Sequence, residues 1–207
     1  DPDFLQLRGI ARYRLKKYDQ AIEAYKEMAA QAAIRKDTTS LITANSILGD
    51  LYYETNDSKS AFAHYKKVLK LSPNEISALN NYAYYLSEEG KNLKKAFAMS
   101  RKTIESEPEN ATYLDTYAWI LFMQGSYSEA QRYMDRVVPR DSTEQFLMTN
   151  EHTTSGILEH AADIAWMNGE IQRAVYLWQL AVRRSDNDAT PMLSKKAKKK
   201  KYYKPKK

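Results

Sequence analysis

The sequence predicts an all-α solenoid, a right-handed superhelix of about five helix–turn–helix hairpins followed by a C-terminal helix. Three observations predict this fold. Apolar residues recur at helical spacing along most of the 207 residues. Only six glycines and six prolines occur, and they fall mainly between the apolar stripes. A small residue also recurs at nearly regular intervals, which indicates a repeated unit.

Residues 42–75 show one such unit most clearly. One apolar stripe lies within residues 47–52 and a second within residues 61–69, and the polar residues 55–58 separate them. Pro73 ends the unit because proline cannot continue a helix. Two short amphipathic helices cannot bury both apolar faces alone, so neighbouring copies are expected to stack.

Copies of this unit follow one another along the chain. The small residue that opens the second helix recurs, with gaps of 40, 35, 34 and 44 residues, at Ala21, Ala61, Ala96, Ala130 and Ala174. Glycines that suit the turn before the second helix stand at Gly90, Gly125 and Gly169. These positions predict an array over residues 1–188, with repeats at about residues 2–36, 42–75, 76–110, 111–143 and 155–188.

The unit at residues 42–75 resembles the tetratricopeptide repeat, which has 34 residues and the pattern W-x2-L-G-x2-Y, A-x3-F, P. The matching residues here are Leu48, Gly49, Tyr52, Ala61 and Pro73, while Asn45 replaces the Trp and Tyr65 the Phe. Gly49 is expected to allow a close approach between helices. The stretches ALNNYAYYLSEEGKNLKKA and YLDTYAWILFMQGSYSEA are similar to bacterial multi-repeat proteins of this family, including exported lipoproteins.

Two segments depart from the repeat. Residues 139–154 lengthen one linker, either as a tolerated insertion or as a loop that contacts a ligand, and residues 146–148 are expected to pack onto the array. Thr190 and Pro191 predict a helix start. Residues 189–207 are therefore predicted to form a capping helix and a polybasic tail.

The basic charge belongs to this tail. The formal charge is +6, and residues 194–207 contain nine lysines and no acid, which leaves a charge of −3 on the preceding residues. Four interpretations of the tail stay open. It could be a solvating helix end, or a polybasic arm that binds anionic lipid, nucleic acid or an acidic protein. It could also be a nuclear-import label, or a ligand for an acidic groove of this chain or of a neighbouring copy. The acidic body disfavours nucleic acid as a partner.

The sequence offers no catalytic centre. Cysteine is absent, which excludes disulfides and thiolate sites. The three histidines, His64, His152 and His160, form no ligand pattern, and phosphate-binding, nucleophile-elbow and zinc-protease motifs are missing. We therefore predict no enzyme activity, no cofactor and no metal site. No stretch reaches the ~20 apolar residues of a membrane span.

The predicted site is a surface. Positions 2, 5, 9, 12 and 13 of each repeat point away from the core stripe, and the resemblance implies that they line a concave peptide groove. Seven of these positions are acidic, one is basic and six are aromatic. The residues predicted to contact a partner are Asp50, Tyr53, Asn80, Tyr84, Asp115, Trp119, Phe122, Glu159, Asp163 and Trp166.

The groove is predicted to be negatively charged. This charge excludes a clamp for a C-terminal carboxylate, which members of the family build from Lys, Arg and Asn. It suits a basic or proline-containing extended segment. The alternative is that Trp119 and Trp166 pack between hairpins while the acids only solvate the face.

The sequence thus predicts a non-catalytic scaffold or adaptor for a protein or peptide partner. Two alternatives stay open: a binder of nucleic acid or an anionic membrane surface through the tail, and an accessory region of a larger enzyme or envelope assembly. The bacterial resemblance favours a periplasmic or envelope-associated location over the cytoplasm. The start at Asp1 suggests further repeats upstream. No oligomeric state is predicted.

Overall fold

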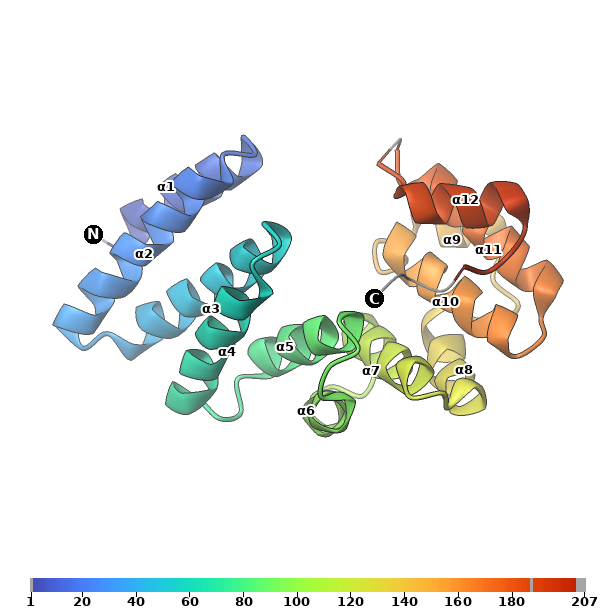
Figure 1. Cartoon of the computed structure of the whole chain (residues 1–207), viewed down its shortest axis with the longest axis horizontal. Helices are drawn as coiled ribbons and strands as arrows, with labels where there is room; N and C mark the ends of the chain where they lie inside the picture. Colours follow the sequence, from blue (N-terminus) through green and yellow to red (C-terminus); the bar gives the residue numbers. More distant parts are fainter. Residues whose placement is uncertain (1, 187, 204–207) are drawn as a thin grey trace. The chain divides into compact units, whose positions relative to one another are not determined.

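The computed structural model describes residues 2–186 and 188–203. These residues form twelve α-helices (Figure 1). They are α1 Pro2–Arg14, α2 Tyr18–Arg35, α3 Thr38–Glu54, α4 Ser58–Leu71, α5 Ile76–Glu88, α6 Leu93–Ser106, α7 Ala111–Met123, α8 Tyr127–Val137, α9 Glu144–Thr149, α10 Ser155–Met167, α11 Ile171–Arg184 and α12 Pro191–Lys199. The predicted all-α class of paired helices is confirmed.

The chain divides into two compact units, here called the N-terminal unit (residues 1–85) and the C-terminal unit (residues 86–207). In the N-terminal unit, the hairpins α1–α2 and α3–α4 form, and α2 packs against α3. In the C-terminal unit, the hairpins are α7–α8 and α10–α11, with α6 packed on α7 and α12 on α11. The boundary falls inside α5.

Each hairpin turn contains at least one residue in the left-handed region of backbone conformation, and the turn between α5 and α6 has a second one, Asn92, with φ of 48°. Gly90, Gly125 and Gly169 have φ angles of 62°, 87° and 83°. Lys16 and Asn56 take the corresponding place in the first two turns, with φ angles of 55° and 63°. Asn tolerates this conformation better than most residues and Lys does not, so the first turn carries a small strain.

The helix starts follow local capping chemistry. Asp37 and Asp57 accept backbone N–H groups of Ser40 and Ser60 at 3.0 Å. Thr190 caps α12, since its Oγ1 accepts the N–H of Leu193 at 3.1 Å, and Pro191 begins the helix.

Close packing of a glycine on a tyrosine ring recurs in the N-terminal unit. A Cβ atom at Gly49 would lie 2.7 Å from Cζ of Tyr65, and one at Gly9 would lie 2.4 Å from Cε2 of Tyr25. Both distances are too short for a real contact, so glycine is required where α1 meets α2 and where α3 meets α4. Ala61 is fully buried at the second of these crossings. The close approach expected at Gly49 is present.

Residues 139–154 are not an irregular loop, because they contain the short helix α9. Within α9, the side chain of Leu147 is buried, whereas Phe146 is 44% exposed. The expected packing of residues 146–148 therefore depends mainly on Leu147.

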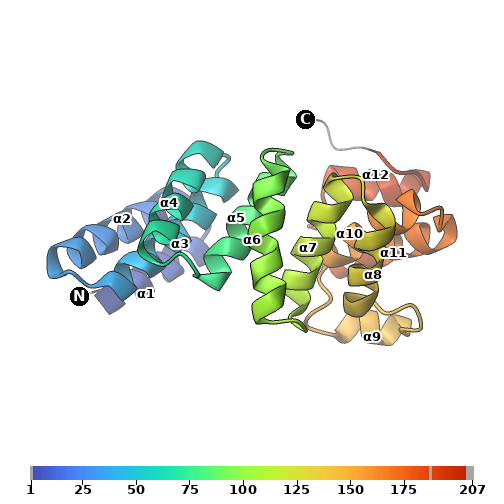
Figure 2. The same ribbon diagram turned by 90° about the horizontal axis from the view of Figure 1, so that it is seen from below.

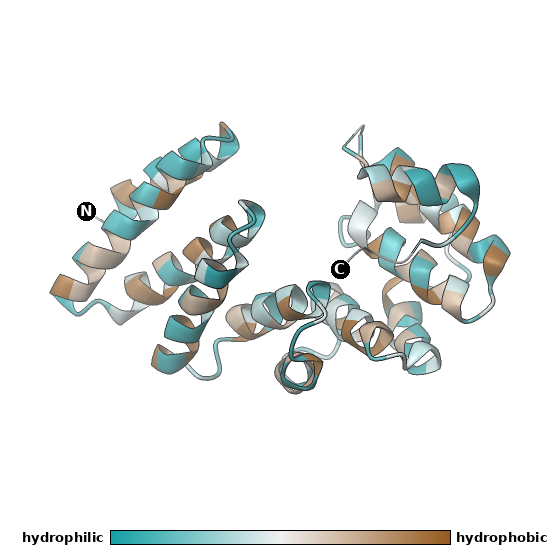
Figure 3. Cartoon of the chain, viewed as in Figure 1, coloured by the Kyte–Doolittle hydropathy of each residue, from teal (hydrophilic) through white to brown (hydrophobic). Residues whose placement is uncertain are grey.

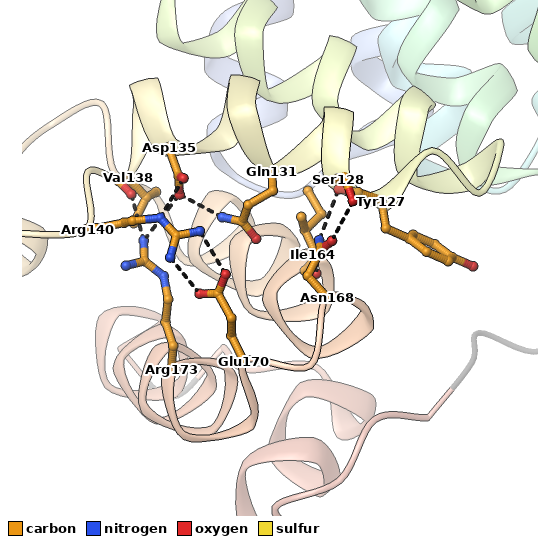
Figure 4. Close-up of polar contacts among 10 residues, drawn as sticks. All are labelled: Tyr127, Ser128, Gln131, Asp135, Val138, Arg140, Ile164, Asn168, Glu170 and Arg173. Atoms are coloured by element: carbon orange, nitrogen blue, oxygen red, sulfur yellow. Dashed lines mark hydrogen bonds and ion pairs between the residues drawn. The ribbon is translucent and has the colours of Figure 1, made fainter.

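Polar contacts join α8 to α10 and α11 across this long connection (Figure 4). Arg140 donates two hydrogen bonds to Glu170, at 3.1 and 2.7 Å, and a third to Asp135 at 2.7 Å. Arg173 donates to the carbonyl oxygen of Val138 at 2.9 Å. Asn168 donates to the carbonyl oxygen of Tyr127 at 3.0 Å. These bonds fix the last hairpin to the one before it although many residues separate them.

Helix α12 lies beside α11 in both orientations (Figures 1 and 2). Its lysines make it mainly hydrophilic in Figure 3. Leu193 and Lys196 are nevertheless buried, so one edge of the helix packs against the unit. None of the helices in the described ranges is both long and apolar enough to cross a lipid bilayer.

Candidate functional site

Six of the ten predicted groove positions of the first two repeats line one cavity in the N-terminal unit. Its volume is about 660 Å³, within the range of ligand-binding sites. It lies between α1, α3 and α5, the first helices of successive hairpins. Its lining residues are Ile10, Tyr13, Arg14, Tyr25, Ile47, Asp50, Leu51, Tyr53, Glu54, Asn81 and Tyr85. Two of the ten predicted contact residues, Asp50 and Tyr53, are among them.

Aromatic rings form much of this cavity, which we call the N-terminal cavity. Tyr53 stacks on Tyr85, with ring centroids 3.8 Å apart and planes inclined by 18°. Tyr13 is 44% exposed, and its ring meets the edge of Tyr18 at 5.9 Å. These rings present flat faces on which proline or a cationic side chain can pack.

The charge of the N-terminal cavity comes from Arg14, Asp50 and Glu54. Glu54 is exposed and accepts the hydroxyl of Tyr18 at 3.0 Å. Burial, together with the nearby carboxylates of Glu54 and Asp50, raises the pKa of Tyr13. Glu54 is therefore the carboxylate of this cavity that faces solvent and can meet an incoming cation.

Asp50 has a different environment. Its Oδ1 atom accepts the hydroxyl of Tyr65, the amide of Asn81 at 3.1 Å and the hydroxyl of Tyr85 at 3.2 Å. Burial raises the pKa of Asp50, although its hydrogen-bond donors oppose this effect. Asp50 thus joins α3, α4 and α5 and belongs to the wall of the cavity more than to its contact surface.

The predicted residues on α5 do not line this cavity. Asn80 is buried and donates to Asn81 at 3.2 Å. Tyr84 is half-buried, and its ring lies 5.6 Å from that of Tyr85. Both residues lie on the helix that carries the lining residues Asn81 and Tyr85, and these two were not among the predicted contact residues.

In the C-terminal unit, Asp115 and Trp119 lie in a buried cluster around His160. Asp115 accepts Nδ1–H of His160 at 2.9 Å. Trp119 stacks on the His160 ring at 4.1 Å and donates its indole N–H to Glu88 at 2.6 Å. Burial lowers the pKa of His160, but Asp115, Glu88 and Asp163 outweigh this effect and raise it to about 9.

A charged His160 therefore forms a buried ion pair with Asp115. Trp119 is 4% exposed. For this residue the structure favours packing between helices over contact with a partner.

Phe122, Glu159 and Asp163 lie under the C-terminal segment of the chain itself. Lys196 of α12 is 1% exposed, and its ammonium group lies 2.8 Å from Glu159 and 2.5 Å from Asp163. The ring of Tyr202 meets the ring of Phe122 edge to face, with centroids 6.3 Å apart. Trp166 packs at 5.4 Å on Trp178, which is fully buried.

Asp50 and Asp163 occupy the same place in their repeats. Each is the ninth residue, and each accepts a hydrogen bond from an aromatic residue fifteen positions later, Tyr65 or Trp178. Each also accepts from the helix that follows, through Asn81 in one repeat and Lys196 in the other. Helix α12 therefore makes the contact that α5 makes in the N-terminal unit, with an ammonium in place of an amide.

A second cavity of the N-terminal unit, of about 560 Å³, lies between α2, α3 and α4. The sequence pattern did not predict this cavity. Lys26, Lys67 and Lys70 line it together with apolar side chains and His64, and no carboxylate is among its described lining residues. Burial and the nearby Lys67 and Lys26 lower the pKa of His64 to about 4.

The described residues contain no group of three or more histidine, aspartate or glutamate side chains arranged to bind a metal. Of the tail, residues 204–207 lie outside the described residues. Lys196 is enclosed by carboxylates, and Lys195 lies over the Tyr203 ring at 4.1 Å.

Comparisons with known proteins agree with this architecture. A model of the tetratricopeptide repeat matches residues 42–75, the range predicted for the second repeat. The chain is similar in structure to TTC0263, a tetratricopeptide-repeat protein of Thermus thermophilus, with 13% identity, a TM-score of 0.70, and 97% of this chain and 98% of that chain covered.

Two further solved structures are similar. PilW, a type IV pilus biogenesis factor, has 15% identity and a TM-score of 0.71, with 96% of this chain and 85% of that chain covered. A tetratricopeptide-repeat protein of Parabacteroides merdae has 18% identity and a TM-score of 0.61, with 96% and 84% covered. No curated protein sequence matches the chain.

At these identities the structures show the fold alone. Tetratricopeptide repeats generally mediate contacts between proteins, and their scaffold is typically non-catalytic. Residues 42–75 are therefore identified as a tetratricopeptide repeat, and the chain has the paired-helix fold of bacterial multi-repeat tetratricopeptide proteins.

Proposed function

We propose that the protein is a non-catalytic adaptor that holds an extended partner segment, basic or proline-containing, in the N-terminal cavity. The main observation in favour is that this cavity combines exposed Tyr13 and half-buried Tyr53 with the solvent-facing carboxylate of Glu54. A cationic side chain can pair with Glu54 while an adjacent proline or alkyl stem packs on the tyrosine rings.

The arrangement of polar groups supports this choice of ligand. Asp50 is held by three donors, so the wall of the cavity is rigid before a partner arrives. A preformed wall lowers the entropy cost of binding. Arg14, which also lines the cavity, can pair with an acidic residue of the partner, which gives the segment a direction.

The proposal is tested with a fluorescein-labelled peptide of sequence KAAKPKK, which has lysines and a proline but no tyrosine, and the full chain, using fluorescence anisotropy at low salt. Glu54→Lys should weaken binding about tenfold, equivalent to about 1.4 kcal/mol, because it places a cation against a cation. Tyr53→Ala should also weaken binding. Added salt should reduce the affinity of the unmodified chain, because exposed charges are screened.

Glu23→Lys is the matched control. It makes the same change of charge on exposed α2 of the same unit, outside the N-terminal cavity. If Glu23→Lys weakens binding as much as Glu54→Lys, peptide affinity depends only on the net charge of the protein and the proposed site is wrong.

A further inference from the structure

The chain turns back on itself after α12. Lys200 adopts a left-handed conformation, with φ of 50°, and the N–H of Lys201 bonds to the carbonyl oxygen of Lys196 at 3.3 Å. This conformation is uncommon for lysine and costs energy. The reversal brings residues 201–203 back over the helix they have just left.

Tyr202 is the residue that this reversal places against the unit. It is half-buried, with its ring edge to face on Phe122 and the Lys196 ammonium 5.5 Å from its centroid. Burial, followed by the charge of Asp163 and the neighbouring Tyr127, raises its pKa. Its environment is therefore a mixed aromatic and acidic one, contributed by α7, α8, α10 and α12.

These contacts use residues at groove positions. Phe122 and Asp163 are the positions at which the repeat pattern predicts partner contacts. The charges are complementary, because a lysine-rich segment lies on a face that carries Glu159 and Asp163. In the N-terminal unit, the equivalent positions Tyr53 and Asp50 line an open cavity.

We propose that the surface around Phe122 and Asp163 is a second peptide-binding site, specific for a tyrosine within a lysine-rich segment, and that residues 200–203 occupy it as a tethered ligand. The site belongs to the C-terminal unit and does not depend on the function proposed for the N-terminal cavity. A partner with the same chemistry binds here only by displacing Tyr202.

The two parts of the C-terminal segment have separate roles. Helix α12 is structural, because Lys196 pairs with buried Asp163 and with partly exposed Glu159. Residues 200–203 have one half-buried ring against the groove and a flanking exposed lysine, Lys201. A short tether gives such a ring a millimolar effective concentration, so weak contacts keep it bound and a stronger partner can replace it.

The test uses the indole N–H signal of Trp119 in NMR spectra of the full chain, because Trp119 stacks on Phe122 at 4.7 Å. Tyr202→Ala should shift this signal, since it removes the ring from Phe122. Adding the acetylated peptide KKKYY to that variant should return the signal towards its original position. The unmodified chain should need at least about tenfold more peptide for the same occupancy, because the tethered ring competes.

Two controls keep the outcome decisive. The peptide KKKAA has the same charge but no tyrosine and should not restore the signal. Phe122→Leu, which keeps an apolar side chain but removes the ring, should weaken the response to KKKYY. An unchanged Trp119 signal in Tyr202→Ala, or equal responses to KKKYY and KKKAA, would overturn the proposal. Glu54→Lys should leave this titration unchanged, which separates it from the test of the N-terminal cavity.

Discussion

Single residues decide whether a groove position contacts a partner or supports the fold. The ninth-position aspartates show this. Sequence periodicity placed Asp50 and Asp163 on the groove face, but both accept bonds from an aromatic residue fifteen positions later. That spacing is present in the sequence as Tyr65 and Trp178. It did not predict the bond, because a hydrogen bond between two helices of a hairpin cannot be inferred from the apolar pattern alone.

Gly49 is a residue whose role was predicted correctly. The motif indicated a close approach, and the structure identifies the ring of Tyr65 as the neighbour. Gly49→Ala should destabilise the protein by about 1–3 kcal/mol, because the new methyl group displaces a buried ring. It should also disturb the bond between Tyr65 and Asp50. Urea denaturation followed by circular dichroism measures the change.

Gly156→Ala is the control for this prediction. A Cβ atom there would have its nearest neighbour, Oγ1 of Thr154, at 3.9 Å. It should be neutral or slightly stabilising, because alanine favours the helix more than glycine does. Equal stability of the Gly49→Ala and Gly156→Ala proteins would contradict the packing described for Gly49.

His160 should make the protein more stable below neutral pH than above it. Its pKa in the folded protein, about 9, lies above the ordinary histidine value of 6.5. The stabilisation is therefore complete below about pH 6.5 and is lost as the pH rises through about 9. The decline should be visible as a lower urea midpoint at pH 9 than at pH 6.

His160→Asn should remove most of this decline, since asparagine can still donate to Asp115 but cannot be charged. His152→Asn serves as the comparison, because His152 is exposed. A decline between pH 6 and pH 9 that is the same in all three proteins would show that His160 is not its cause.

At the scale of the element, local sequence signals predicted helix positions well. The Thr-Pro pair marked the start of α12. The short helix α9 was not predicted, because six residues are too few to show helical periodicity. The ion pair of Arg140 with Glu170 was also missed, since these residues are thirty positions apart.

Helix α12 should contribute to stability mainly through Lys196. Lys196→Met keeps the apolar stem but removes the cation, leaving Glu159 and Asp163 without their partner. The expected cost is about 3–5 kcal/mol, the usual effect of breaking a buried ion pair from one side. Urea denaturation of the full chain is the measurement.

Lys199→Met on the same helix is the matched control, because Lys199 is exposed. It should change stability by less than about 0.5 kcal/mol, as surface substitutions usually do. Adding Asp163→Asn to Lys196→Met should recover part of the loss. Similar costs for Lys196→Met and Lys199→Met would mean that the buried pair does not hold α12 in place.

For the whole molecule, the repeat period predicted the fold class because each hairpin repeats the same apolar pattern. The division at residues 85 and 86 was not predicted. It could not be, since the pattern is the same on both sides of this point. The sequence also could not show which part of the chain occupies the groove face. The tail had the right composition for an acidic face, but composition cannot show that Tyr202 reaches Phe122.

The central claim is that the N-terminal cavity is the site for a partner segment. It is tested most directly by recording amide shifts of the ¹⁵N-labelled full chain during titration with the tyrosine-free peptide KAAKPKK. The largest shifts are expected at cavity-lining residues of α1, α3 and α5, Tyr13, Tyr53 and Glu54 among them. Shifts confined to the C-terminal unit, or spread over all exposed carboxylates, would contradict it.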